Sequence, residues 1–183
     1  ATQANRATRL ERGVHVVGPG SGYLACGDVD TGRMSEPEDI VEAVCEVLNP
    51  APQDLAGKRI VITAGPTHEP IDPVRFIGNR SSGKMGIALA GEAARRGAAV
   101  TLVLGPTSLD VLRGVECVRV QTAAEMLQAA LSAFQTADAA ICAAAVADYT
   151  PAAPADHKLK KATARLDRIE LVDTGDILAE LCR

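Results

Sequence analysis

The segment from Gly78 to Gly86 has the composition of a phosphate-binding turn. It reads GNRSSGKMG, its first seven residues fit G-x-x-x-x-G-K, and an alanine-rich helix is expected to follow. Free N–H groups at a helix N-terminus attract anions, and Gly83 and Gly86 let a phosphate or a neighbouring strand approach the backbone. An ordinary serine-capped helix packed closely on a sheet would use the same residues, so the pattern leaves both interpretations open.

Two features argue against a P-loop in this segment. Met85 stands where a Ser or Thr should hold Mg²⁺. The preceding strand is expected to end near Ala64, more than a dozen residues before the turn, whereas a P-loop follows its strand directly. We therefore predict anion binding of another kind.

Small and acidic residues come at the end of a second apolar strand. The run AAAVADY covers residues 143–149, and ligands of open α/β sheets lie outside the carboxyl ends of the strands. Ala144 and Ala145 would expose backbone groups to a ligand, although close core packing explains Ala143 and Ala144 equally well. Asp148 needs a partner, as a strand-end carboxylate usually does.

A proline- and alanine-rich loop follows, over residues 147–161, and it carries Lys158, Lys160 and Lys161. Such a loop is typical of a lid that closes on a nucleotide. It is also compatible with a plain solvated basic loop.

The elements that must position these residues alternate between strands and helices over residues 58–183. We predict strands at 59–64, 100–104, 115–121, 138–146 and 166–172, and helices at 82–96, 123–134 and 176–181, with a long loop over 65–81. This rhythm predicts an α/β fold with a Rossmann-like, doubly wound, mostly parallel sheet. Because such a sheet usually continues, we expect the chain to be truncated at its C-terminus.

Residues 1–49 follow a different pattern. We predict a short strand from Gly13 to Val17, a glycine-rich loop, and a helix from about Glu36 to Leu48 whose apolar residues recur at helical spacing. Asn49 to Pro52 break that pattern, so residues 50–57 are expected to be a linker.

Composition excludes several classes of protein. The formal net charge is −4 and no long basic run occurs, which argues against binding to nucleic acid or to a membrane surface through bulk charge. No apolar run is long enough for a membrane span. The five cysteines are odd in number and lack CxxC spacing, so a reducing compartment, the cytoplasm, is the natural location.

Four motifs in order, GPTHEPIDPVR, FIGNRSSGKMG, AAAVADY and KLKK, resemble those of bacterial phosphopantothenoylcysteine synthetase. The loop GYLACGDVDTGRM resembles the C-terminal end of phosphopantothenoylcysteine decarboxylase. The chain is thus similar to the junction of the bifunctional coenzyme A proteins, in which residues 1–49 would end the decarboxylase and residues 58–183 would form part of the ligase. The resemblance implies ligation of 4'-phosphopantothenate and cysteine, with CTP and Mg²⁺, through an acyl-cytidylate.

The resemblance also implies roles for the matched residues. Asn79 would hold the acyl intermediate, Lys158 would contact CTP, and Lys161 would help to neutralise pyrophosphate. Arg75 would reach the substrate phosphate across a homodimer interface, within a higher oligomer of the parent protein. Contacts to the nucleotide are implied for Gly65, Ser81, Gly83, Gly86, Ala143, Ala144, Asp148, Gly175, Asp176, Ile177 and Leu178, and contacts to the pantothenate for Ala144, Ala145 and Asp148. The metal ligands remain unknown.

Two departures qualify this transfer. Thr174-Gly175 stands where the family usually has a residue followed by proline. A loop without this proline is less rigid, so the resemblance supports the roles of residues 175–178 less strongly. Cys26 would protonate the ene-thiolate intermediate of the decarboxylase, but the FMN-binding half and the catalytic histidine of that enzyme are expected outside this chain. We therefore expect residues 1–49 not to decarboxylate alone.

Two other functions are known for folds of this class. An NAD(P)-binding oxidoreductase would require G-x-G-x-x-G directly after Ala64 and an acidic residue ending the second strand, and the sequence has neither. A non-catalytic nucleotide-binding or assembly module would bind nucleotide without turnover.

Overall fold

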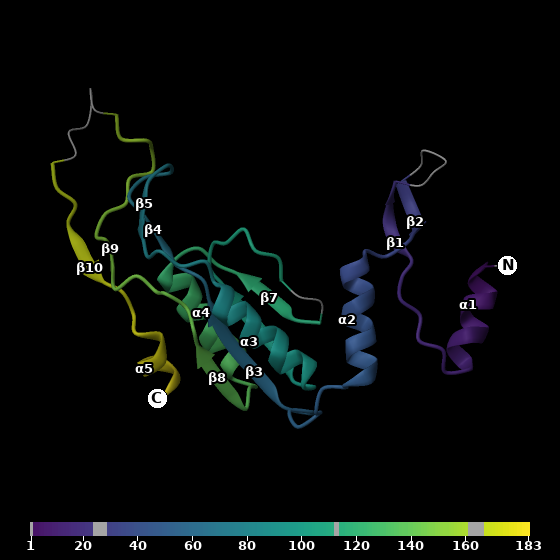
Figure 1. The fold of residues 1–183 in the computed structure, drawn as a ribbon. Coiled ribbons are helices and arrows are strands. Elements are labelled where there is room, and N and C mark those ends of the chain that lie inside the picture. The colour runs from purple at the N-terminus through teal and green to yellow at the C-terminus, as the bar shows by residue number, and fades with distance from the viewer. Residues whose placement is uncertain (1, 24–28, 112–113, 161–166) are drawn as a thin grey trace. The chain divides into compact units, whose positions relative to one another are not determined.

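The computed structural model describes residues 2–23, 29–111, 114–160 and 167–183 (Figure 1). The chain divides into two compact units, residues 1–51 and residues 52–183. The division falls within the segment that we expected to be a linker.

The first unit contains helix α1 (Thr2–Glu11), strands β1 (Gly20–Tyr23) and β2 (Val29–Arg33), and helix α2 (Pro37–Leu48). β1 and β2 pair as an antiparallel hairpin. None of the side chains described in this unit is buried, and Val41, Val44 and Leu48 of α2 are all exposed. This unit therefore forms no core of its own among its described residues.

The prediction of a strand from Gly13 to Val17 is wrong. These residues follow α1, and the amides of Gly13 and Val14 donate to the carbonyls of Leu10 and Arg9, which closes the helix with Gly13 at φ +76°. The helix predicted from about Glu36 to Leu48 is confirmed as α2, with Pro37 in its first turn, where a missing N–H costs little.

The second unit is built on a parallel sheet of four strands. These are β3 (Arg59–Ala64), β6 (Ala99–Leu104), β7 (Glu116–Arg119) and β8 (Ala139–Cys142), and their spatial order is β7-β6-β3-β8. All neighbouring strands pair in parallel. The predicted strands and the Rossmann-like fold are thus confirmed, although β8 stops at Cys142 instead of continuing to Val146.

Helices cover both faces of this sheet. α3 (Lys84–Arg95) packs on the face that presents Ile60, Ile62 and Leu102. α4 (Ala123–Phe134) and α5 (Ile177–Leu181) pack on the face that presents Val61 and Val103. The sheet is therefore doubly wound, as predicted. Among the described residues, every helix is too short or too polar to cross a bilayer.

Two antiparallel hairpins lie outside the main sheet. β4 (His68–Pro70) pairs with β5 (Phe76–Gly78) inside the segment that we predicted to be a long loop. β9 (Tyr149–Pro151) pairs with β10 (Leu171–Asp173), so the last predicted strand is confirmed only over its final residues. Figure 1 shows these hairpins beyond the same end of the sheet, that to which β3 and β8 run.

Candidate functional site

The strand order reverses between β3 and β8, because β6 follows β3 on one side and β8 lies on the other. Ligands of doubly wound folds bind at such a switch point, beyond the carboxyl ends of the strands. Gly65 follows β3 and Ala145 lies three residues after the end of β8. The Ala145 amide donates a 2.8 Å hydrogen bond to the Gly65 carbonyl, so the two chain segments stay paired beyond the sheet. The candidate site is therefore centred on this switch point.

Three glycines bring the strand ends and the start of α3 into backbone contact. Gly65 has φ +79° and Gly83 has φ +76°, which is the left-handed region that favours glycine. A Cβ on Gly83 would lie 3.2 Å from the Gly65 Cα, and a Cβ on Gly105 would lie 1.8 Å from the Pro66 carbonyl oxygen. A side chain would therefore be strained at positions 65 and 83 and would clash at position 105.

The N-terminus of α3 opens at this cluster. Gly83 caps the helix without a side chain, while the hydroxyls of Ser81 and Ser82 accept from the amides of Gly83 and Lys84 at 3.3 and 3.4 Å. The amides of Met85 and Gly86 have no acceptor among the described residues. Free amides at a helix N-terminus suit a phosphate.

Gly86 has a packing role. A Cβ at this position would lie 2.4 Å from the Cβ of Ala64, so glycine is what lets α3 approach β3. Of the two uses that the sequence left open for Gly86, the structure accounts for the close approach of a strand.

Asn79 connects the turn before α3 to the end of β8. Its side-chain amide donates to the carbonyl oxygen of Val146 at 2.9 Å and to that of Ala145 at 3.4 Å. The side chain of Asn79 is exposed. It is thereby fixed at the switch point while its own carbonyl oxygen faces no described donor.

Three threonines that sequence reasoning missed hold the segment after β8. The hydroxyl of Thr67 is buried and accepts from the Ala147 amide at 3.0 Å, and that of Thr63 accepts from the Ala144 amide at 3.4 Å. Thr174 donates to the Ala147 carbonyl at 2.6 Å. A threonine at the end of an apolar strand was the available signal, because its hydroxyl needs a partner once buried.

Residues 175–178 have mixed surroundings. The side chain of Asp176 caps α5 by accepting from the Ala179 amide at 3.0 Å, and Ile177 is buried against α4. A Cβ on Gly175 would meet Leu127, while Leu178 is exposed. The described contacts of Asp176 and Ile177 are therefore structural.

Arg75 is bonded within its own chain. Its Nε and Nη2 donate to the carboxylate of Asp72, whose side chain is fully buried, and Nη2 also donates to the Leu159 carbonyl at 2.9 Å. The guanidinium holds the pKa of Asp72 well below its usual range, although burial acts in the opposite direction. No described residue accepts from Nη1, so that edge of the guanidinium is available to an anion.

The remaining predicted residues lie at the periphery or outside the described chain. Asp148 is exposed, and its backbone carbonyl accepts from the Thr174 amide at 2.9 Å. Ala143 and Ala144 are half-buried, and Lys158 is exposed in the loop after β9. Cys26 and Lys161 lie outside the described residues.

Burial raises the pKa of the Cys117 and Cys142 thiols, as suits unreactive cysteines.

The described residues offer no group of three or more His, Cys, Asp or Glu side chains that could hold a metal. Mg²⁺ commonly binds through one or two carboxylates, water and the phosphates of a substrate. The described side chains therefore form no protein-only metal cage.

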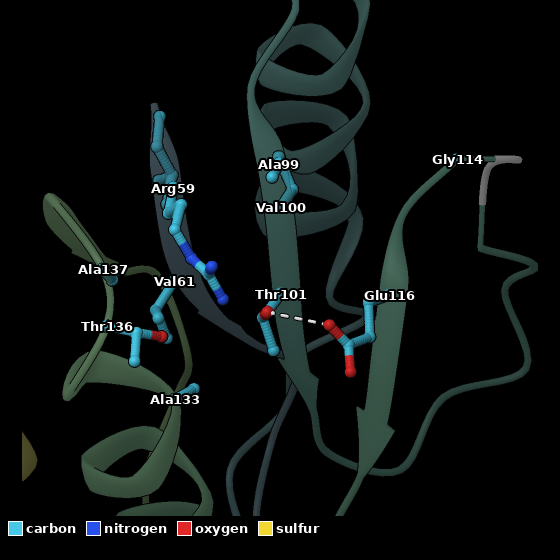
Figure 2. A pocket seen from close by; sticks show the side chains of 11 residues that line it. Arg59, Val61, Ala99, Val100, Thr101, Gly114, Glu116, Ala133, Thr136 and Ala137 are labelled. Atoms are coloured by element: carbon cyan, nitrogen blue, oxygen red, sulfur yellow. Dashed lines mark hydrogen bonds between the residues drawn. The ribbon is translucent and has the colours of Figure 1, made fainter. Parts of the chain in front are cut away.

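A separate cavity of about 180 Å³ lies at the opposite end of the sheet (Figure 2). It is lined where β3, β6 and β7 begin, and within it Thr101 donates a 3.3 Å hydrogen bond to Glu116. A six-residue strand spans roughly 17 Å. This cavity is thus removed from the switch point by the length of β3.

Fold and site define the second unit as a Rossmann-like α/β domain with an open helix N-terminus at its switch point. The sequence model of the DNA/pantothenate metabolism flavoprotein C-terminal domain matches residues 55–183. The chain belongs to this family, which confirms the resemblance drawn from the four motifs.

The chain is similar to several curated proteins. It is 51% identical over 183 residues to the coenzyme A biosynthesis bifunctional protein CoaBC of Vibrio parahaemolyticus, which covers 99% of this chain and 45% of that protein. It is 49% identical to a cysteine/cysteine sulfinic acid decarboxylase of an unknown prokaryote, over 99% of this chain and 51% of that protein. The chain thus spans about half the length of these curated relatives.

A solved structure of the C-terminal domain of CoaBC resembles the fold with a TM-score of 0.59. The sequences are 50% identical, and the match covers 69% of this chain and 59% of that one. The fold assigned from the sequence is thus supported by a structure of high sequence identity.

Proposed function

We propose that this chain contributes a phosphopantothenate–cysteine ligase site to a protein of coenzyme A biosynthesis. In this reaction the carboxylate of 4'-phosphopantothenate attacks the α-phosphate of CTP, which releases pyrophosphate and forms an acyl-cytidylate. The cysteine amine then displaces CMP to give the amide. The relative from Vibrio parahaemolyticus is named as a protein of coenzyme A biosynthesis. The four sequence motifs support ligation as the step in that pathway.

The observation that carries this proposal is the meeting of Gly65, Gly83 and Asn79 at the switch point. The free amides at the start of α3 suit the nucleotide phosphates. Asn79, held by the carbonyls of Ala145 and Val146, presents a neutral acceptor to the acyl centre without burying a charge. In the proposed site, hydrogen-bond donors for an anion and a neutral polar group would surround the reacting phosphate.

The other roles follow from the same proposal. Ser81 lies at the phosphate turn. Ala143, Ala144 and Asp148 would contact the nucleotide base, and Gly175 and Leu178 would add contacts to the nucleotide. Ala144, Ala145 and Asp148 also contact the pantothenate. Lys158 supplies positive charge to CTP. Mg²⁺, bound with the nucleotide, would neutralise the triphosphate.

The free edge of the Arg75 guanidinium is suited to a substrate phosphate of a second subunit. We therefore propose a homodimer.

The activity is expected in the cytoplasm, since the cysteine pattern suits a reducing compartment. We further propose that the first unit belongs to a flavoprotein decarboxylase domain with Cys26 as its acid, because α2 presents an apolar face that the unit itself does not cover.

The relative named as a decarboxylase sets a competing prediction. A cysteine or cysteine sulfinate decarboxylase would release CO₂ without nucleotide. The ligase consumes CTP and requires the pantothenate acid. Product analysis with isotopically labelled cysteine distinguishes the two reactions. Transfer of the label into an amide supports the ligase, whereas CO₂ release from cysteine without nucleotide contradicts the ligase.

A further inference from the structure

The carboxylate of Asp72 is the most heavily bonded side chain described in this domain. Oδ1 accepts from the amides of Val74 and Arg75, each at 2.9 Å. Oδ2 accepts from the Arg75 guanidinium and from the Leu159 amide at 3.1 Å. The two Oδ1 bonds and the ion pair with Arg75 are local, whereas the bond from the Leu159 amide reaches a loop 87 residues away.

Leu159 is held through both of its backbone groups. Its N–H donates to Asp72, and its carbonyl accepts from Nη2 of Arg75 at 2.9 Å. The amide of Ala155 adds a 2.9 Å bond to the Ile71 carbonyl. The segment from Ala155 to Leu159 therefore lies along the turn between β4 and β5, as the neighbouring traces in Figure 1 indicate.

Leu159 stands between Lys158 and Lys160, whose side chains are exposed. A lysine side chain loses substantial conformational entropy when it is fixed on a ligand. Fixing the backbone beside it beforehand lowers the remaining cost. The bonds to Leu159 therefore do more than close a surface loop, because they also restrict the position of the neighbouring lysine backbone, from which the side chain extends.

We propose that Asp72 is a positioning residue that, with Arg75, clamps the backbone of Leu159 so that Lys158 is presented to the nucleotide. This inference rests on the proposed ligase function. It assigns Asp72 no contact with substrate, and its effect passes through Lys158.

The chemistry of the turn provides a selective variant. In Asp72→Asn, the amide oxygen can still accept from Val74 and Arg75. The amide nitrogen then faces the Arg75 guanidinium and the Leu159 N–H, so donors meet donors. The turn is kept and the clamp is broken.

A matched control lies elsewhere in the same unit. Asp54 forms a similar two-bond pair with the guanidinium of Arg96, but half of its side chain is exposed and it touches neither hairpin nor loop. Asp54→Asn therefore removes an equivalent ion pair without touching the clamp.

The first measurement is hydrogen–deuterium exchange of the Leu159 amide in the unliganded chain. Asp72→Asn should accelerate its exchange by about tenfold or more, as expected for loss of a charge-assisted hydrogen bond, and Asp54→Asn should not. Unchanged protection in Asp72→Asn would overturn the clamp. If Asp72→Asn does not fold, Arg75→Lys, which keeps the charge and loses the fork, must show the faster exchange instead.

The second measurement is the CTP dependence of pyrophosphate release by the full-length protein that contains this chain. Asp72→Asn should lower kcat/KM for CTP by about tenfold, whereas Asp54→Asn should match the parent. Combined with Lys158→Ala, it should cause little further loss, because both variants remove the same contribution. Additive losses would show that Asp72 does not act through Lys158.

The two proposals fail in different ways. No pyrophosphate release by the parent protein would overturn the ligase function, and the positioning role with it, whatever the exchange data. An active parent with an unaffected Asp72→Asn variant would overturn the positioning role alone.

Discussion

The side-chain amide of Asn79 donates a 2.9 Å hydrogen bond to the carbonyl oxygen of Val146. The two residues are 67 positions apart, and the bond joins the turn before α3 to the segment that leaves β8. One neutral side chain thus connects the proposed phosphate site to the proposed acyl site.

Asn79→Asp tests whether this neutrality matters. A carboxylate would face the carbonyl oxygens of Ala145 and Val146 without a proton to donate, so the side chain should turn away. We expect pyrophosphate release to fall by about a hundredfold, the size expected when a group at the reacting centre is misplaced. Because Asn79 is exposed, the thermal midpoint should change little. An active variant, or one that is inactive only because it unfolds, would contradict this role.

Gly86→Ala tests the packing of α3 on β3. The added methyl would lie 2.4 Å from the Ala64 Cβ, so the helix must shift. Overpacking of this kind costs about 1–3 kcal/mol, measured as the free energy of unfolding in urea. Met85→Ala is the control, because Met85 is exposed in the same helical turn and its loss should change stability by roughly 0.5 kcal/mol or less. Equal stabilities of the two variants would refute the packing role.

The low pKa of Asp72 predicts the pH dependence of stability. Its folded-state pKa lies below that of the unfolded chain, so its contribution is complete above about pH 4 and is lost as the pH falls further. The urea midpoints of the parent chain and of Asp72→Asn should therefore differ by a constant amount from about pH 5 to 8 and converge below about pH 4. A difference that varies near neutral pH would point to another titrating group.

Chelation tests where the magnesium is held. Since the described donors form no metal cage, EDTA should stop pyrophosphate release and leave the thermal midpoint unchanged. Added Mg²⁺ should restore the activity. A fall in the thermal midpoint on chelation would instead reveal a resident metal site.

The parallel sheet was predictable because its strands are apolar runs separated by amphipathic helices, and packing agreed with that local pattern. The hairpin of β4 and β5 was not, since its strands are three residues long and include Pro70. Pairing between these short strands is decided by tertiary contacts. Helix α1 was missed because its sequence is polar and has no apolar stripe.

The candidate site divides in the same way. Gly83 and Asn79 stand in a motif whose composition indicates a phosphate turn, so they could be named from the sequence. Asp72 could not, because DPVR reads as an ordinary exposed turn, and burial of its carboxylate depends on Leu159 arriving from a distant loop. The threonines at the strand ends also become informative only once their partners are known.

The central claim is tested most directly by pyrophosphate release from CTP and 4'-phosphopantothenate, by the full-length protein that contains this chain. We predict release that requires the pantothenate acid, prefers CTP to ATP, becomes catalytic when cysteine is added, and is lost in Asn79→Ala. Normal binding of CTP with no release of pyrophosphate would contradict the ligase and leave a nucleotide-binding module.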